Sequence, residues 1–495
     1  MRKQFSFEID NVISFKEKLL HYAKNIERFC VLDSSNSSEF SGNTYNCIAG
    51  IDAMEEISPC ENSFEALKKF HQKKNDWLFG YLSYDLKDEI EPPTLPSPNG
   101  GRSEEGGGIR FPQMHFFQPK YVFRLKGNKV EIGFLPEVSS EEEVENLFHE
   151  ILNCPLSLVP RPSSPKISQR ISKQNYIRTI KRIKNHIHRG DIYEMNYCME
   201  FFSEQAEINP VGNNSNGVNP AEVFLKLNET SQAPFSAFYR MNDNYLLCAS
   251  PERFLKKDGR KIISQPIKGT ARRGVTISED IELKELLLQN EKEKSENVMI
   301  VDLVRNDLSR TCDNVRVDEL FGVYTFKQWH QMISTVSGEM RNDVHFADVI
   351  KNAFPMGSMT GAPKIRAMEL IEQYEKTKRG LYSGAVGYIT PASPLNPLSS
   401  RREEKGAGVV WGEADFDFNV VIRSILYNSS SKYLSFQVGS AITANSIPEN
   451  EYEECLLKTK GMFEALKAQP QPSDARNLRL SLGGEHEVEK SESVF

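Results

Sequence analysis

The sequence lacks the features that mark membrane, secreted and nucleic-acid-binding proteins. No run approaches the about 18 apolar residues that a membrane-spanning helix needs, and the opening MRKQFSFEID has no apolar signal core. Lysine and arginine total 61 against 68 aspartate and glutamate, so the net charge of -7 gives no reason to expect a phosphate-backbone partner. We therefore expect a cytoplasmic protein that binds neither membranes nor nucleic acid.

Cysteine is sparse and scattered. Eight cysteines occur in 495 residues, and no two of them have the C-x-x-C spacing of a zinc ligand pair or a redox motif. We expect reduced, mostly buried thiols. Hydrophobic residues at 39% and aromatic residues at 10% are ordinary for a folded globular protein and too abundant for pervasive disorder.

Stretches rich in Pro, Gly, Ser and charge interrupt the apolar periodicity. They are residues 91–108, the Pro-rich segment 160–165, residues 390–408 and the residues from 469 onward. We interpret the segment 160–165 as a linker and the C-terminal tail as disordered. The predicted divisions are an N-terminal region, a larger domain and a polar tail, at residues 1–160, 172–466 and 467–495.

The periodicity of the remaining chain indicates a mixed α and β fold. Helical patterns such as YIRTIKRIKNHIHRG alternate with short β-rich runs such as YLLCAS, KIISQPI and YLSFQVG. The strands come in pairs and hairpins. This arrangement favours antiparallel sheets covered by helices, an α/β (α+β) class, over a doubly wound parallel sheet.

Two helical segments carry carboxylates at helical spacing. Glu451, Glu454 and Lys458 fall on one face of a helix, and Glu293 and Glu296 fall on one face of another, just before the apolar run VMIVDLV. In one interpretation these are solvated helix faces. In the other they converge on a hard cation that cancels their repulsion, and oxygen ligands without His or Cys suit Mg²⁺.

A glycine-rich turn, PMGSMTGAPK, leads into a helix. Lys364 comes three residues after Gly361 with a proline between them, which does not match a P-loop, so we exclude phosphate binding of that kind. Two interpretations remain. The segment is a tight structural turn, or it holds a small carboxylate with Thr360 adding a hydroxyl donor.

Lys268 occupies a short strand and turn, KIISQPIKGTARRG, directly before Gly269. Glycine at this position permits close approach of a ligand to the backbone. In one interpretation Lys268 is a surface residue of a basic turn. In the other it is a nucleophile, on the condition that burial or neighbouring cations lower its pKa enough to free the amine.

Taken together, these segments resemble the chorismate-utilising enzymes, the family of the anthranilate, aminodeoxychorismate, isochorismate and salicylate synthases. The resemblance covers Ser172 to about Leu466. It rests on GDIYEMNYC, SPERF, QPIKGTARR, SENVMIVDLVRNDLSR, PMGSMTGAPKIRAMELIE, RGLYSGAVGY, FNVVIRS and EYEECLLK, all in the family's order. It implies an α/β domain of two antiparallel sheets sandwiched by helices, holding chorismate and Mg²⁺ between them.

The resemblance also implies roles for particular residues. Glu296 and Glu454 match metal ligands, with Glu293 and Glu451 holding the water shell, and the cation bridges to the ring carboxylate of chorismate. Glu252, in SPERF, matches a general acid that protonates the hydroxyl leaving ring carbon C4, although an exposed turn residue is the alternative.

Further positions match the family's substrate contacts. Arg423 and Lys458 fall where the family binds the substrate's carboxylates. The full set of matching positions is Thr270, Gly357, Thr360, Tyr382, Arg423, Gly439 and Lys458.

Lys268 decides the subfamily that the resemblance implies. Anthranilate and isochorismate synthases generally carry Ala at this position, whereas aminodeoxychorismate synthases carry PIKGT, as here. In that class the lysine amine attacks ring carbon C2, ammonia then adds at C4 and expels the lysine, and no pyruvate is released. The implied product is 4-amino-4-deoxychorismate, on the way to 4-aminobenzoate and folate.

Two positions depart from the family pattern. Glu194 stands where amine-using members often have Gln and water-using members have Lys, so the routing of the nucleophile stays open. His330 is displaced by one position from the usual histidine, and we assign it no catalytic role.

The expected partner is a separate subunit. No G-x-C-x-G element of a glutaminase is present, so ammonia is expected from a glutamine amidotransferase subunit. Two alternatives to an aminodeoxychorismate synthase stay open. They are an anthranilate synthase component I and a non-catalytic, chorismate-binding regulatory protein.

Overall fold

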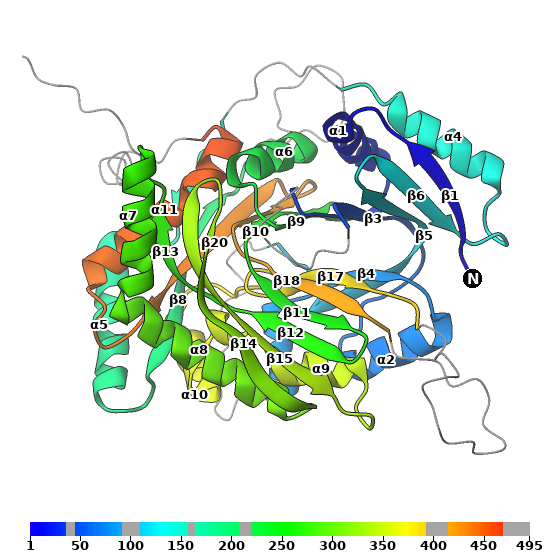
Figure 1. Ribbon diagram of the computed structural model, residues 1–495. Coiled ribbons are helices and arrows are strands. Elements are labelled where there is room, and N and C mark those ends of the chain that lie inside the picture. The colour runs from blue at the N-terminus through cyan, green and yellow to red at the C-terminus, as the bar shows by residue number, and fades with distance from the viewer. Residues whose placement is uncertain (36–44, 92–108, 157–163, 207–218, 393–413, 469–495) are drawn as a thin grey trace, which may run out of the picture.

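The computed structural model describes residues 1–35, 45–91, 109–156, 164–206, 219–392 and 414–468 (Figure 1). The predictions for residues 92–108, for most of the segments 160–165 and 390–408, and for the tail from 469 lie outside these residues.

Seven of the eleven described helices begin after a residue whose side chain accepts a hydrogen bond from the first helical turn. At the start of α4 (Glu141–Leu152), for example, Ser140 and Glu143 each accept a hydrogen bond from the other's backbone N–H, at 3.1 and 2.7 Å respectively. The helices are α1 (Val12–Tyr22), α2 (Ser63–Lys74), α3 (Lys87–Ile90), α4 (Glu141–Leu152), α5 (Lys173–His188), α6 (Pro220–Ser231), α7 (Ile277–Gln289), α8 (Glu291–Ser309), α9 (Phe346–Ala353), α10 (Lys364–Tyr374) and α11 (Pro448–Leu466), with short 3₁₀ helices at Ala23–Asn25, Tyr84–Leu86 and Gly357–Met359.

Strands account for most of the remaining described residues. They are β1 (Lys3–Glu8), β2 (Arg28–Asp33), β3 (Cys47–Ile57), β4 (Leu78–Leu82), β5 (Met114–Lys126), β6 (Lys129–Phe134), β7 (Ser168–Gln169), β8 (Glu194–Ser203), β9 (Phe235–Met241), β10 (Asn244–Ser250), β11 (Arg253–Asp258), β12 (Lys261–Gln265), β13 (Ile267–Arg272), β14 (Cys312–Thr325), β15 (Trp329–Met340), β16 (Gly361–Ala362), β17 (Ala385–Ile389), β18 (Phe416–Val420), β19 (Ser424–Asn428) and β20 (Tyr433–Ile442).

The strands form antiparallel layers with helices on the outside, as Figure 1 shows. One apolar cluster joins strands to α1, α4, α5, α6 and α11, and a second joins strands to α2, α8 and α9. A third cluster contains strand and loop side chains without helix residues, including Phe79 and Tyr239, and fills the interior between the layers. The predicted fold class is confirmed, although the described strands join into one continuous hydrogen-bonded network rather than two separate sheets.

Strands from both predicted divisions of the chain pair directly. β2 lies between β3 and β9, and β4 pairs with β17, so segments before residue 160 and after residue 172 share the same sheet. The division of the chain into domains stays a prediction.

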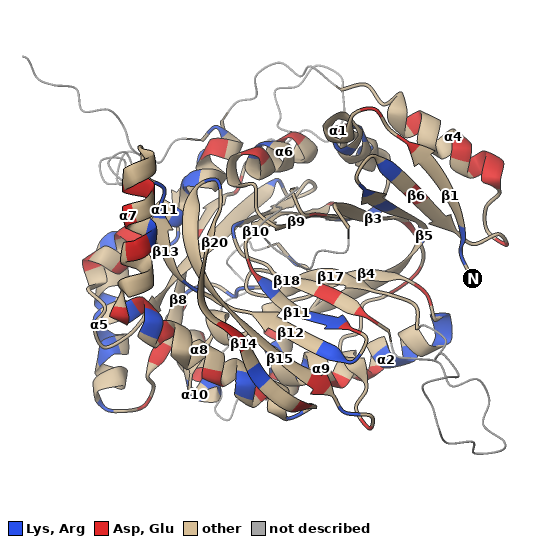
Figure 2. Cartoon of the chain, viewed as in Figure 1, with Lys and Arg blue, Asp and Glu red and all other residues tan. Residues whose placement is uncertain are grey.

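Charged side chains of both signs are intermixed along the helices in the view of Figure 2, with α4 mainly acidic at its start. Among the helices that the structure describes, none combines the length and the apolar character needed to cross a bilayer.

Candidate active site

Most of the residues predicted from the sequence line one cavity of about 380 Å³, here called the Lys268 cavity. Strands β13 and β20 and the first turns of α8 and α11 contribute to its walls. Eleven of the thirteen predicted residues line it: Glu252, Lys268, Thr270, Glu293, Glu296, Tyr382, Arg423, Gly439, Glu451, Glu454 and Lys458. We take this cavity as the candidate active site, and the role of each residue stays a prediction.

Lys268 reaches the cavity through an irregularity in β13. The pairing of β13 with β15 shifts register between Ile267 and Thr270, so Lys268 lies in a bulge. Gly269 has a φ of 97°, and a side chain there would meet Cβ of Glu293 at 3.3 Å. Bulges often redirect side chains beside active sites, and glycine adopts this backbone conformation without strain. The glycine after Lys268 therefore allows α8 to pack close to the bulge.

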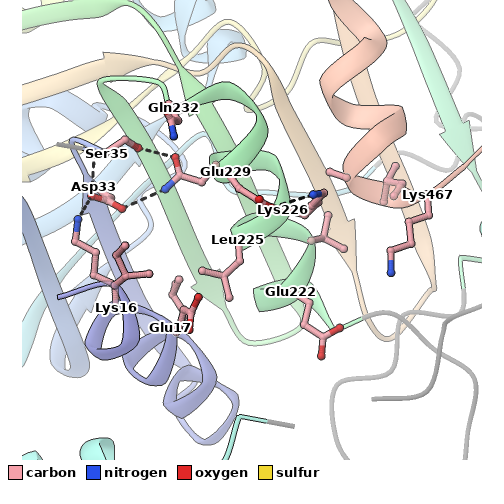
Figure 3. A pocket seen from close by; sticks show the side chains of 16 residues that line it. Lys16, Glu17, Asp33, Ser35, Glu222, Leu225, Lys226, Glu229, Gln232 and Lys467 are labelled. Carbon is pink, nitrogen blue, oxygen red and sulfur yellow. Dashed lines mark hydrogen bonds and ion pairs between the residues drawn. The ribbon is translucent and has the colours of Figure 1, made fainter. Parts of the chain in front are cut away.

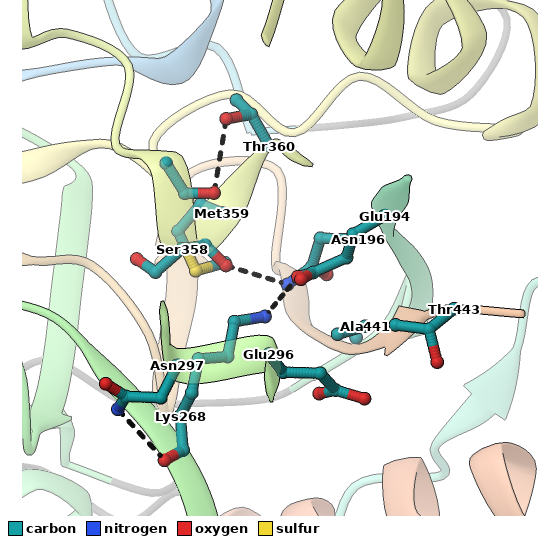
Figure 4. Close-up of polar contacts among 12 residues, drawn as sticks. Glu194, Asn196, Lys268, Glu296, Asn297, Ser358, Met359, Thr360, Ala441 and Thr443 are labelled. Carbon is teal, nitrogen blue, oxygen red and sulfur yellow. Dashed lines mark hydrogen bonds and ion pairs between the residues drawn. The ribbon is translucent and has the colours of Figure 1, made fainter. Parts of the chain in front are cut away.

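The Lys268 side chain is buried and paired with a carboxylate. Only 9% of the side chain is exposed, and Nζ donates to Oε1 of Glu194 at 2.5 Å (Figure 4). Burial lowers the pKa of Lys268, but the nearby carboxylates of Glu194, Glu296 and Glu252 outweigh burial and raise the pKa above its usual value. The interpretation of Lys268 as a nucleophile requires a lowered pKa, but in the resting protein the pKa is raised instead. The amine therefore needs a proton acceptor before it can attack.

Glu194 is the carboxylate that the structure places beside this amine. It begins β8 and is fully buried, and Oε2 has no hydrogen-bond partner among the described residues. Within a buried pair a proton passes over a short distance from nitrogen to oxygen, so Glu194 is suited to accept the lysine proton.

Glu252 lies in the turn between β10 and β11 and faces the cavity. It is 4% exposed, so the interpretation as an exposed turn residue is wrong. Burial raises the pKa of Glu252 to about 7, against the opposing effects of Lys268 and of Ser358, whose hydroxyl donates to Oε1 at 2.6 Å. A carboxyl group that keeps its proton near neutral pH is suited to general acid catalysis.

The acidic faces of α8 and α11 meet at this cavity. Glu293 and Glu296 come from the first turns of α8, and Glu451 and Glu454 come from the first turns of α11. Glu296 and Glu451 are buried, unlike residues of a solvated helix face. Lys292 lies between the helices, with Nζ 3.8 Å from Oε1 of Glu296 and 3.6 Å from Oε1 of Glu451.

The chemistry of this carboxylate set fits a hard cation. Within the described residues, no three His, Cys, Asp or Glu side chains stand close enough together to hold a metal ion as they are. Oε1 of Glu296 is nevertheless buried without a hydrogen-bond partner. Burial, together with the neighbouring Glu194 and Glu293, raises the pKa of Glu296 to about 7. This set offers only oxygen ligands, and Oε1 of Glu296 lacks a partner although the Lys292 ammonium already provides one positive charge nearby. Such a set suits Mg²⁺.

Two cationic side chains also face the cavity. Arg423 precedes β19 with a φ of 51°, a backbone conformation that is unusual for arginine. Its guanidinium lies 5.9 Å from the Trp329 ring centre and makes no hydrogen bond or ion pair with any described residue. Lys458 donates to the backbone oxygen of Gly439 at 2.8 Å and pairs with Glu454 at 2.7 Å. These groups are suited to bind a ligand's carboxylates.

Gly357 and Thr360 are the two predicted residues that do not line the cavity. Thr360 is fully buried, and its hydroxyl donates to backbone oxygens of Met356 at 3.0 Å and of Gly357 at 3.3 Å. A side chain on Gly357 would approach Leu303 to 2.7 Å, so glycine permits close packing against α8. The hydroxyl predicted to contact substrate is engaged within the turn, which favours the structural interpretation of this segment.

Some functional candidates escape prediction from the sequence. Ser358 contacts Glu252 across 106 residues, for which the sequence contains no signal. Lys292 lies one helical turn before Glu296. This spacing could have identified Lys292 from the sequence, but a search for carboxylates alone overlooks it. His330, to which no role is assigned from the sequence, does not line the cavity.

A second, larger cavity of about 540 Å³ lies among α1, α6 and the end of α11 (Figure 3). None of the thirteen predicted residues lines it. Lys16 and Asp33 pair there at 2.6 Å, and Asn228 donates to the same carboxylate at 3.1 Å. Because most of the residues that match the chorismate-utilising enzymes line the Lys268 cavity instead, that cavity remains the candidate active site.

Comparison with known proteins identifies the family to which the sequence is similar. The sequence matches the chorismate binding enzyme family over residues 19–396 and 405–464. Aminodeoxychorismate synthase component 1 of Bacillus subtilis is 31% identical, over 96% of this chain and 98% of its own length. The chloroplastic aminodeoxychorismate synthase of Arabidopsis thaliana is 37% identical over 60% of this chain, a stretch that spans only 29% of the plant protein.

A solved structure supports the fold. Anthranilate synthase component I from Streptococcus pneumoniae superposes with a TM-score of 0.66 at 24% identity, covering 88% of this chain and 92% of its own. The family match covers most of the sequence, and the Bacillus subtilis relative is matched along nearly its whole length. The chain therefore belongs to the chorismate binding enzyme family.

Proposed function

We propose that this chain is an aminodeoxychorismate synthase, which converts chorismate and ammonia to 4-amino-4-deoxychorismate for 4-aminobenzoate and folate synthesis. The observation that carries the proposal is Lys268, a buried amine that lines the same cavity as Glu252 and the carboxylates of α8 and α11. A lysine on the surface of a basic turn would be exposed to solvent rather than enclosed in this cavity.

Binding of chorismate uses both charged parts of the site. Arg423 and Lys458, which both line the cavity, would bind the substrate carboxylates. Glu296 and Glu454 would hold Mg²⁺, with Glu293 and Glu451 around its water shell, and the bound ion would supply positive charge beside the ring carboxylate. Burial of the reacting groups excludes water that would otherwise compete with ammonia.

The proposed reaction then proceeds in two substitutions. Lys268 transfers a proton to Glu194, and its neutral amine forms a bond to ring carbon C2. Glu252 protonates the C4 hydroxyl, which leaves as water. Ammonia next bonds to C4 and the C2–nitrogen bond breaks, which returns the electron pair to Lys268. The added ammonium gives one proton back to Glu252, and Glu194 returns its proton to the lysine.

The source of ammonia and the location of the enzyme belong to the same proposal. Ammonia would come from glutamine through a separate amidotransferase subunit, and free ammonium at high pH would substitute for it. The location would be cytoplasmic.

Product analysis tests the proposed function. With chorismate, Mg²⁺ and ammonium, we expect 4-amino-4-deoxychorismate without release of pyruvate, measured by mass spectrometry and a coupled pyruvate assay. Anthranilate with stoichiometric pyruvate would instead identify an anthranilate synthase. Chorismate binding without turnover would identify a non-catalytic binding protein.

Glu252 gives a prediction with a defined pH dependence. Because its pKa is raised to about 7, the protonated acid is present below that pH and is lost above it. At constant free ammonia and saturating Mg²⁺, the wild-type rate should fall as pH rises through about 7. Glu252→Gln should lower the rate by about 10²–10⁴-fold and remove this pH dependence.

Initial rates between about pH 6 and 9 provide the measurement. Ser358→Ala serves as the matched variant. The Ser358 hydroxyl lowers the pKa of Glu252, so its removal should move the loss of activity to higher pH. A wild-type profile that does not change between these limits would contradict the assignment of Glu252 as the acid.

A further inference from the structure

Lys292 is the side chain that connects the two acidic helix faces. It stands one residue before Glu293 and one helical turn before Glu296 on α8, and it reaches across to Glu451 on α11. Its Nζ lies 3.8 Å and 3.6 Å from the nearest oxygens of Glu296 and Glu451. The lysine thus lies between one predicted metal-site carboxylate on each helix.

The surroundings of Lys292 are dominated by carboxylates. Its ammonium forms ion pairs with Glu296 and Glu451, both of which are buried, and Glu293 and Glu454 line the same cavity. All four carboxylates of the predicted metal site therefore share one cavity with this ammonium. Without a cation among them, carboxylates held this close together would repel one another.

The contacts of Lys292 are those of a replaceable counter-ion. Both separations exceed the 2.7–3.2 Å or so of a direct hydrogen bond, so the ammonium is held by charge rather than by fixed hydrogen bonds. The side chain is 38% exposed, whereas those of Glu296 and Glu451 are 8% and 4% exposed. A flexible lysine stem with a path to solvent can withdraw, while the carboxylates stay in place.

We propose that Lys292 is a built-in competitor for the metal ion: its ammonium pairs with Glu296 and Glu451 in the metal-free protein and must withdraw when a divalent cation binds. It therefore weakens metal affinity and stabilises the metal-free state. This inference rests on the metal site of the proposed function but is independent of which product the enzyme makes.

The chain offers a matched control two residues further along α8. Lys294 carries the same charge on the same helix but pairs with Glu291 at 3.1 Å and does not line the cavity. Lys294→Gln removes one positive charge from α8 without changing the carboxylate cluster. It corrects for any general effect of net charge on metal binding.

The test measures metal binding by the whole chain without chorismate. Free Mn²⁺ is followed by electron paramagnetic resonance and Mg²⁺ binding by calorimetry, and thermal unfolding is recorded with chelator and with metal. We expect Lys292→Gln to bind metal about tenfold more tightly than the wild type, because competition is removed. In chelator it should unfold at a lower temperature, and excess metal should restore its stability. Lys294→Gln should match the wild type.

A second variant covers the case in which Lys292→Gln fails to fold without metal. Lys292→Arg keeps the positive charge, so its metal affinity should stay at or below that of the wild type. Unchanged or weaker metal binding by folded Lys292→Gln would overturn the inference, as would tighter binding by Lys292→Arg. If the wild type binds no metal at millimolar concentrations, both this inference and the metal site fail, whereas the product analysis is judged separately.

Discussion

Replacing Lys268 with alanine is expected to lower the rate of 4-amino-4-deoxychorismate formation by about three orders of magnitude or more. The amine is the only part of this side chain that can form a bond to the substrate ring. A water molecule in its place would not form the covalent intermediate on which the two-step substitution depends. The cavity would keep Glu252, Arg423 and the carboxylates, so binding of chorismate should be affected less than turnover.

The measurement separates catalysis from folding. Rates are measured with saturating ammonium, and chorismate affinity is measured independently by calorimetry. Lys257→Ala is the matched control, because Lys257 is also a buried lysine, 2% exposed and paired with Asp415, but does not line the cavity. It should keep the wild-type rate. Diversion of Lys268→Ala towards anthranilate would agree with the proposal, whereas unchanged formation of 4-amino-4-deoxychorismate would remove the covalent route.

Removal of the metal is expected to have an effect of similar size. Chelation of Mg²⁺ should abolish activity reversibly, and Glu296→Gln should lower activity by about a hundredfold or more at Mg²⁺ concentrations that saturate the wild type. Glu296 is chosen because its Oε1 is buried without a partner, and the amide keeps the shape of the side chain while removing its charge.

Metal titration of activity and direct Mn²⁺ binding test this prediction. Glu291→Gln is the control, since Glu291 lies on the same helix, is 85% exposed and pairs with Lys294 outside the cavity. It should behave as the wild type. Full wild-type activity in excess chelator would contradict the metal assignment.

Local sequence patterns predicted the elements that bear the site, because helical spacing and glycine positions are properties of neighbouring residues. The i to i+3 spacing of Glu293 and Glu296 and of Glu451 and Glu454 placed each pair on one helix face, and the structure brings both faces to the same cavity. The PIKGT segment likewise contains both the lysine and the glycine of the bulge that directs it.

Local patterns could not predict contacts between residues that lie far apart in the sequence. The pairing of Glu194 with Lys268 joins residues 74 positions apart, and it reverses the expected direction of the lysine pKa. Lys292 was missed for a different reason, since it stands beside the carboxylates in the sequence and only its reach to Glu451 on α11 shows its place among them. Thr360 illustrates the converse, because a hydroxyl that looked available is engaged by its own turn.

Covalent catalysis by Lys268 is tested most directly by the mass of the peptide that contains this residue, after the protein has been incubated with chorismate and Mg²⁺ without any source of ammonia. We expect Lys268 to carry the mass of chorismate less one water, and the adduct to disappear with formation of 4-amino-4-deoxychorismate when ammonium is added. An unmodified Lys268 in a preparation that nevertheless forms this product on addition of ammonium would contradict covalent catalysis by Lys268.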